Sequence, residues 1–222
     1  MKHLFEQLKH SPTYQQLHTA VSQFTTPLTN KHQCRHVIME TMAEGIQQYP
    51  ELHLRHQDQD LVLRIRLAED TDLSQIDQVQ DRAYQGQVAW NYADFVQDWY
   101  KNPYAVYLVI EAQVLIQDSA GDPAPSHLIA GIIGRFRAND AHISQLFVDP
   151  DYQGQGLGSL LIQIWQDQMA CFKIGVSKLE VRQSNTAAQR LYRRHGYYVY
   201  DQHSRYYYDN HETALLMKYQ VD

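Results

Sequence analysis

The sequence predicts an α+β fold with a largely antiparallel sheet. Short stretches with apolar residues at every second position recur along residues 61–220, as in half-buried strands. Between them lie stretches with apolar residues three or four positions apart, as in amphipathic helices. With 222 residues, 44% of them hydrophobic, the chain can form a substantial core.

The predicted elements follow one another in a simple order. Strands are expected at residues 61–67, 104–116, 127–137, 141–148 and 177–182, with a final pair after residue 196. Helices are expected at 72–84, at 91–100, from the glycine-rich loop to about 172, and at 185–195. Residues 118–126, with the sequence DSAGDPAPS, form a turn-rich connection between strands.

The first sixty residues differ from the rest. They are rich in Gln and His, and helical spacing appears around Leu4 and Leu8 and again between Val37 and Ile46. The polar residues 53–60 then resemble a linker. We therefore expect two parts, a helical N-terminal extension at residues 1–60 and a larger domain at residues 61–222.

Composition argues against several functional classes. The net charge of −6 provides no positive field to attract nucleic acid or an anionic membrane. No stretch approaches the ~18 apolar residues of a membrane span, and the N-terminus lacks a signal-peptide core. Cys34 and Cys171 lie far apart, which gives no disulfide framework and indicates a reducing cytoplasm.

A metal site is not expected. His32, Cys34 and His36 fall within about one helical turn, but their spacing is not that of a zinc signature. A polar helix face is the better interpretation.

A glycine-rich loop carries the first functional signal. In LFVDPDYQGQGLGSLLIQIW, an apolar strand leads through Gly154, Gly156 and Gly158 into a helix. Glycines let the backbone approach a ligand closely and direct several N–H groups toward it, and the helix dipole adds to the attraction for anions. The inward stripe expected of this helix is Leu157, Leu160, Leu161, Ile164 and Trp165.

Two common phosphate loops do not fit. A P-loop needs Lys followed by Ser or Thr after its last glycine, whereas Ser159 and Leu160 follow Gly158. The dinucleotide fingerprint needs a sixth-position glycine, where Ser159 stands when the count starts at Gly154.

The loop resembles the pyrophosphate motif of the GNAT N-acetyltransferase superfamily, Q/R-x-x-G-x-G/A, here Gln153-x-x-Gly156-x-Gly158. The later segment Asn185-x-x-Ala188-x-x-Leu191-Tyr192-x-x-x-Gly196-Tyr197 is similar to the second motif of that superfamily. LEVRQSNTAAQRLYRRHGY and YYYDNHETALLMKY resemble the ribosomal-protein-alanine (RimI-like) branch over roughly residues 61–222.

The resemblance implies a fold, a cofactor and its contacts. The fold would be the GNAT α/β sandwich, with a mostly antiparallel, mixed central sheet flanked by helices. The co-substrate would be acetyl-CoA, with no metal. The implied cofactor contacts are Leu146, Phe147 and Val148 on a strand that splays and exposes its N–H groups, the loop Gln153, Gly154, Gln155, Gly156, Leu157, Gly158 and Ser159, and Asn185.

Two side chains have candidate catalytic roles. Glu180 lies opposite Leu179 and Val181 on its strand, and the pattern alone leaves it as either a solvated carboxylate or a general base. Tyr192 lies on a helix capped by Asn185 and ended by Gly196, where a lone Tyr is more often a core aromatic. The resemblance implies that Glu180 is the base, acting through water, and that Tyr192 protonates the departing thiolate.

The acceptor is expected to be a protein N-terminus, a small-subunit ribosomal protein being one candidate. An α-amine with a pKa of ~8 is easier to deprotonate than lysine at ~10.4, by roughly 3 kcal/mol. The resemblance implies that Tyr206 and Tyr207 line the acceptor groove, although packing explains most tyrosines of this tail. The alternatives are a lysine or small-molecule amine acetyltransferase and a non-catalytic CoA-binding module.

Overall fold

The computed structural model describes residues 31–47, 49–87, 90–115, 124–137 and 140–221. Its α-helices are α3 (Lys31–Gln47), α4 (Leu73–Tyr84), α5 (Tyr92–Lys101), α6 (Leu157–Cys171) and α7 (Thr186–Arg194), with short 3₁₀ turns η2 (Asp70–Asp72) and η3 (Pro150–Tyr152). Its strands are β1 (Leu52–His56), β2 (Gln59–Leu67), β3 (Ala105–Val114), β4 (His127–Phe136), β5 (Ala141–Val148), β6 (Val176–Arg182), β7 (Tyr198–His203) and β8 (Ala214–Gln220).

These elements agree with the sequence prediction between residues 61 and 220, apart from a few residues at their ends. The expected helix around Leu4 and Leu8 and most of the turn-rich connection at 118–126 lie outside the described residues.

The strands form one eight-stranded sheet in the described part of the chain, in the order β1-β2-β3-β4-β5-β6-β8-β7. All neighbours are antiparallel except β5 and β6, which run parallel. The sheet is therefore mixed and mostly antiparallel. The parallel pair lies near its middle, and β6 leads directly into α7.

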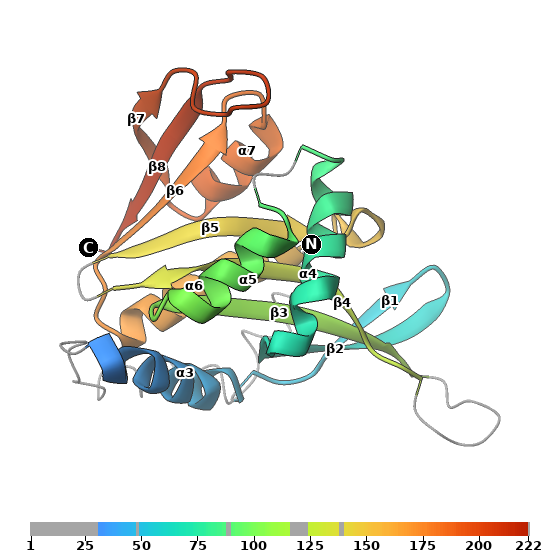
Figure 1. Cartoon of the computed structure of the whole chain (residues 1–222). Helices are drawn as coiled ribbons and strands as arrows, with labels where there is room; N and C mark the ends of the chain where they lie inside the picture. Colours follow the sequence, from blue (N-terminus) through green and yellow to red (C-terminus); the bar gives the residue numbers. More distant parts are fainter. Residues whose placement is uncertain (1–30, 48, 88–89, 116–123, 138–139, 222) are drawn as a thin grey trace.

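Helices cover both faces of the sheet (Figure 1). The buried side chains of α3, α6 and α7 belong to one hydrophobic cluster, and those of α4 and α5 belong to a second cluster on the opposite face. The predicted stripe of α6 faces the first cluster, since Leu157, Leu160, Leu161, Ile164 and Trp165 are all buried. Burial of these apolar side chains fixes α6 and its glycine-rich start against the sheet.

The prediction of a linker at residues 53–60 is wrong. These residues form most of β1, a tight turn and the start of β2, with Leu54 paired to Leu61. Gln57 and Asp58 have positive φ angles of 46° and 62°, as hairpin turns require. The stretch looks like a linker because an edge strand exposes many polar side chains, while Leu52 and Leu54 point into the core.

The region before residue 60 also contributes to the domain core. Ile38, Met42 and Ile46 of α3 are buried in the same cluster as α6. The boundary expected near residue 60 consequently falls inside a hairpin of the sheet.

The parallel strands β5 and β6 pair only over a short length. Ala141 pairs with Ser177, His142 with Lys178 and Ile143 with Leu179. Beyond these pairs the strands diverge, as Figure 1 shows where β6, β8 and β7 rise away from β5. The splay implied by the resemblance is thus present, and from Ser144 onward it leaves one edge of β5 without a strand partner among the described residues.

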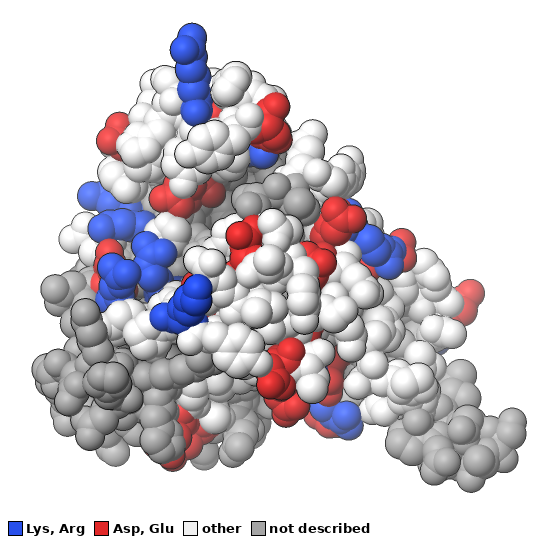
Figure 2. Space-filling view, in the orientation of Figure 1, with Lys and Arg blue, Asp and Glu red and all other residues white. Residues whose placement is uncertain are grey.

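Charge is mixed on the surface. On the face shown in Figure 2, Asp and Glu side chains are scattered over the molecule and Lys and Arg side chains gather mostly toward the left. No helix in the described ranges is long and apolar enough to cross a membrane.

Candidate active site

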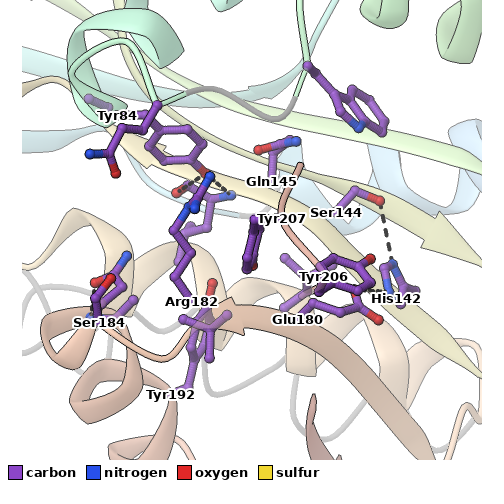
Figure 3. A pocket seen from close by; sticks show the side chains of 18 of the residues that line it. Tyr84, His142, Ser144, Gln145, Glu180, Arg182, Ser184, Tyr192, Tyr206 and Tyr207 are labelled. Atoms are coloured by element: carbon purple, nitrogen blue, oxygen red, sulfur yellow. Dashed lines mark hydrogen bonds and ion pairs between the residues drawn. The ribbon is translucent and has the colours of Figure 1, made fainter. Parts of the chain in front are cut away.

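A pocket of about 550 Å³ opens where β5 and β6 diverge. It joins segments far apart in the sequence, from the end of α4 to the loop between β7 and β8 (Figure 3). Six residues singled out from the sequence line it: Leu146, Glu180, Asn185, Tyr192, Tyr206 and Tyr207.

Glu180 lies on the pocket face of β6. Strand alternation puts Leu179 and Val181 in the core and leaves the Glu180 side chain 26% exposed. Its Oε2 atom lies 2.8 Å from Nε2 of His142. Burial alone would raise the pKa of Glu180, but the hydrogen bond and charge of His142 and the charge of Arg135 outweigh it, so the pKa lies below its usual value.

Tyr192 projects into the pocket from α7. Asn185 begins this helix by accepting a hydrogen bond from the Ala188 N–H, and Gly196, with φ of 82°, follows its end. Tyr192 is 6% exposed, and no side chain in the described ranges forms a hydrogen bond with its hydroxyl. Burial raises its pKa well above the usual value, so the phenol keeps its proton at neutral pH.

The start of α6 has the geometry of an anion cradle. Gly154 and Gly156 adopt φ angles of 80° and 91°, which L side chains rarely adopt, and Gly156 is the N-cap of α6. A Cβ atom on Gly158 would lie 3.2 Å from Leu191 of α7, so a side chain there would crowd the two helices. The side chain of Gln153 donates to the Val148 carbonyl and ties the loop to β5.

Two predicted cofactor contacts can reach a ligand only through their backbone. The side chains of Phe147 and Leu157 are 1% exposed and belong to the two cores. Val148, Gln155 and Ser159 are half-buried outside the pocket, and Asn185 uses its side-chain oxygen as a helix cap. The pocket and the glycine loop are consecutive along β5 rather than one cavity.

The unpaired edge of β5 is partly occupied by Tyr84, at the end of α4. Its hydroxyl donates to the Leu146 carbonyl at 3.0 Å and lies 3.3 Å from the Leu146 N–H. Burial raises the pKa of Tyr84 to about 12. Nearby, Arg82 forms ion pairs with Asp149 and Asp151, so the end of α4 is fixed to the strand and loop.

The loop between β7 and β8 closes the other side. Tyr206 and Tyr207 contact each other edge to face, with ring centroids 5.2 Å apart. A second hollow of about 960 Å³ continues from them and shares Trp90 and Arg182 with the first. Together the two hollows give the site an extended mouth.

Sequence reasoning missed Tyr84, Arg135 and His142. Each lies on a different element, and their proximity depends on strand register and on the divergence of β5 and β6. The alternation in β5 indicates which face His142 occupies, but not its neighbours. The side chains of His32, Cys34 and His36 lie outside the described residues, and in the described ranges no group of three or more His, Cys, Asp or Glu residues could hold a metal.

Comparisons with known proteins point to one family. The sequence profile of the acetyltransferase (GNAT) domain matches residues 122–220. A Bacillus subtilis (strain 168) protein named "Putative ribosomal protein bS18-alanine N-acetyltransferase" is 34% identical over 129 residues, which are 58% of this chain and 77% of that protein. The ribosomal protein bS18-alanine N-acetyltransferase of Escherichia coli (strain K12) is 41% identical over 59 residues, 27% of this chain and 40% of that enzyme.

Solved structures share the fold. The ribosomal-protein-S18-alanine N-acetyltransferase from Escherichia coli superposes with a TM-score of 0.59 and 26% identity, covering 72% of this chain and 94% of that one. The PaiA N-acetyltransferase from Thermoplasma acidophilum, solved with coenzyme A, gives a TM-score of 0.53 at 18% identity, covering 72% of this chain and 99% of that one.

Proposed function

Because the chain belongs to the GNAT family and is an acetyl-CoA-dependent N-acetyltransferase, we propose that it acetylates the N-terminal α-amine of a protein. The observation that carries this proposal is the pocket at the divergence of β5 and β6. There a carboxylate on one wall and a protonated phenol on another flank the open edge of β5.

We propose that the glycine loop binds the pyrophosphate of acetyl-CoA. The contacts would come from backbone N–H groups of residues 153–159, which the positive φ angles of Gly154 and Gly156 and the start of α6 make available. Each such charge-assisted bond stabilises the complex by ~1.5–3 kcal/mol. An acidic protein can in this way hold an acidic co-substrate without a basic surface.

The backbone of residues 146–148 is the proposed contact for the pantetheine arm. Their edge has no partner in β6, so N–H and C=O groups remain for a ligand. At Leu146 the Tyr84 hydroxyl already accepts from the N–H. A ligand carbonyl that takes this N–H must displace the phenol oxygen, and we expect Tyr84 to shift when acetyl-CoA binds.

The residues of the pocket divide the proton transfers between them. Acetyl-CoA supplies the acetyl group as a thioester, whose C–S bond breaks as the amine nitrogen forms a bond to the carbonyl carbon. Glu180 takes the proton that the amine loses, through a water molecule. Tyr192 donates its proton to the departing sulfur, which leaves as a thiol.

The α-amine is favoured over lysine by the strength of the base. The pKa of Glu180 lies below its usual value, so the carboxylate is a weak base. An α-amine with a pKa of ~8 makes a smaller demand on it than lysine at ~10.4. The extended mouth beside Tyr206 and Tyr207 has room for a polypeptide. The Bacillus subtilis and Escherichia coli relatives are named for acetylation of the alanine of a ribosomal protein.

The test compares acceptors with acetyl-CoA as donor and follows thiol release. We expect turnover with a peptide that starts with a free alanine, and none with its N-terminally blocked copy carrying an internal lysine. Turnover only on the blocked peptide or on a polyamine such as spermidine would contradict the proposal. CoA binding without thiol release on any amine would favour a non-catalytic module.

A further inference from the structure

Three charged or polar side chains form a row across the floor of the pocket. Arg135 on β4 lies directly opposite His142 on β5 in the antiparallel register. His142 and Glu180 of β6 lie on the same face of the parallel pair, whose last pairs are His142–Lys178 and Ile143–Leu179. The row therefore crosses three strands at the point where β5 and β6 begin to diverge.

The hydrogen bonds along this row can all donate in the same direction, from Arg135 through His142 to Glu180. Arg135 Nη1 lies 3.4 Å from Nδ1 of His142. On the other side of the ring, Nε2 of His142 lies 2.8 Å from Oε2 of Glu180, and Figure 3 shows these two side chains next to each other. A guanidinium can only donate, so Nδ1 accepts its bond when that nitrogen carries no proton. The ring proton then sits on Nε2 and is donated to Glu180.

Ser144 completes the surroundings of the imidazole. Its hydroxyl lies 3.5 Å from His142 Nδ1, next to the guanidinium contact. The His142 side chain is 15% exposed, less than that of Glu180 at 26%. The imidazole is thus the more buried partner of the pair, with Arg135 and Ser144 at Nδ1 and Glu180 at Nε2.

We infer that His142 is a positioning residue that fixes one oxygen of the Glu180 carboxylate and holds the group in the pocket. The inference rests on the proposed role of Glu180 as the base. A glutamate on a strand has three rotatable side-chain torsions, and a charge-assisted hydrogen bond at one oxygen removes most of that freedom. Proton transfer needs such fixed geometry.

The same contact favours the ionised state of Glu180. Because a donor to the carboxylate stabilises the charged form, removing it raises the pKa of Glu180. A base must be ionised to act, so without the imidazole Glu180 would lose its charge, and with it its capacity to act as base, at a higher pH. The other ionisable groups that face the pocket are Arg135 on β4, Arg182 on β6, Tyr84 on α4, Tyr192 on α7 and Tyr206 and Tyr207 on the β7–β8 loop.

These other groups do not titrate in the acidic range. Arginines remain protonated. Burial raises the pKa of Tyr84, Tyr192, Tyr206 and Tyr207, so these phenols stay neutral. In the acidic range, a carboxyl titration of the protein without acceptor therefore reports on Glu180 and not on these groups.

The test replaces the imidazole in two ways in the full chain. His142→Leu removes the donor, whereas His142→Gln places an amide N–H near the position of Nε2. The Glu180 carboxyl is titrated by ¹³C NMR without any acceptor, its signal assigned from Glu180→Gln. His53→Leu, an exposed strand histidine on β1, is the matched control.

We expect the titration midpoint of Glu180 to rise by roughly one to two pH units in His142→Leu, and kcat to fall roughly 10- to 100-fold. Binding of acetyl-CoA should stay unchanged. In His142→Gln, both the titration midpoint and kcat should return most of the way to their native values. The inference would be overturned by an unchanged Glu180 midpoint in His142→Leu, or by an equal loss of kcat in His142→Leu and His142→Gln.

Results that contradict the proposed function can be distinguished from results that contradict the role of His142. If Glu180→Gln acetylates the peptide as fast as the native protein, Glu180 is not the base, whatever the His142 variants do. If the peptide is not an acceptor, the carboxyl titration still reports on the His142–Glu180 contact, because it needs no acceptor.

Discussion

The guanidinium of Arg182 lies over the ring of Tyr207, 3.9 Å from the ring centroid. The same guanidinium pairs with Asp209 at 2.8 Å and with Glu212 at 3.4 Å. Glu212 also accepts from the Ser184 N–H, which anchors the loop a second time. The end of β6 thereby holds the β7–β8 loop against the pocket.

Replacing Arg182 by Lys should loosen this loop. Lysine keeps the charge but loses the planar fork that stacks on Tyr207 and reaches two carboxylates. We expect the KM for a peptide acceptor to rise roughly tenfold, the effect of losing about 1.4 kcal/mol of interaction, while acetyl-CoA binds as before. Steady-state kinetics and calorimetry measure both. Arg190→Lys, exposed on α7, is the control, and an unchanged KM would show that Arg182 does not organise the acceptor side.

Removing the Tyr192 hydroxyl should impair chemistry rather than binding. Its raised pKa keeps the phenol protonated, and Tyr192→Phe removes that proton donor without changing the ring. We expect kcat to fall ~10²-fold or more, with the Kd for acetyl-CoA kept. Tyr197→Phe is the matched control, because the Tyr197 hydroxyl donates to Ser177 in the core instead. Equal turnover in Tyr192→Phe and the native protein would remove the acid role.

CoA binding should be sensitive to substitution of the glycines whose backbone is left-handed. Gly156 has φ of 91°, so Gly156→Ala strains the backbone by about 1–3 kcal/mol or shifts the N–H groups. We expect weaker binding of CoA, measured by calorimetry. Gly175→Ala is the control, since its Cβ would meet nothing within 4 Å and its φ is not positive. The cradle would be in doubt if both variants bound CoA like the native protein.

The sheet should not tolerate a side chain at Gly134, beside the irregular pairing of β4 and β5. A Cβ atom there would lie 2.0 Å from the His142 carbonyl oxygen and 2.8 Å from Trp165. Because backbone blocks the added atom, we expect Gly134→Ala to lower the free energy of unfolding by at least about 2 kcal/mol. Denaturant unfolding measures this, and a change below about 0.5 kcal/mol would mean that the strands readjust freely.

Much of the fold could be predicted because its signals are local. The stripe on α6, the Asn185 cap and the alternation of β5 depend on neighbours within a few residues, and the structure confirms them. The β1–β2 hairpin was misjudged because an edge strand is polar on its exposed face, which hides the pairing of Leu54 with Leu61.

The site was predictable only in part. Motifs located Glu180, Tyr192 and the glycine loop. His142 instead contacts Glu180, 38 positions further along the chain, and Tyr84 contacts Leu146, 62 positions further along. Such contacts depend on the register and divergence of β5 and β6, which no local pattern reports. The ring of Phe147 belongs to the core, so the contact predicted for this residue, which concerns its backbone, stays a prediction.

The position of the acetyl group on a single peptide distinguishes acetylation of the α-amine from acetylation of lysine. A peptide with both a free N-terminal alanine and an internal lysine is incubated with acetyl-CoA and the full chain, and fragmentation mass spectrometry locates the acetyl group. We expect one acetyl group, on the α-amine of the alanine, and its loss in Glu180→Gln. Acetylation of the lysine side chain alone, or a Glu180→Gln variant that modifies the alanine at the native rate, would contradict it.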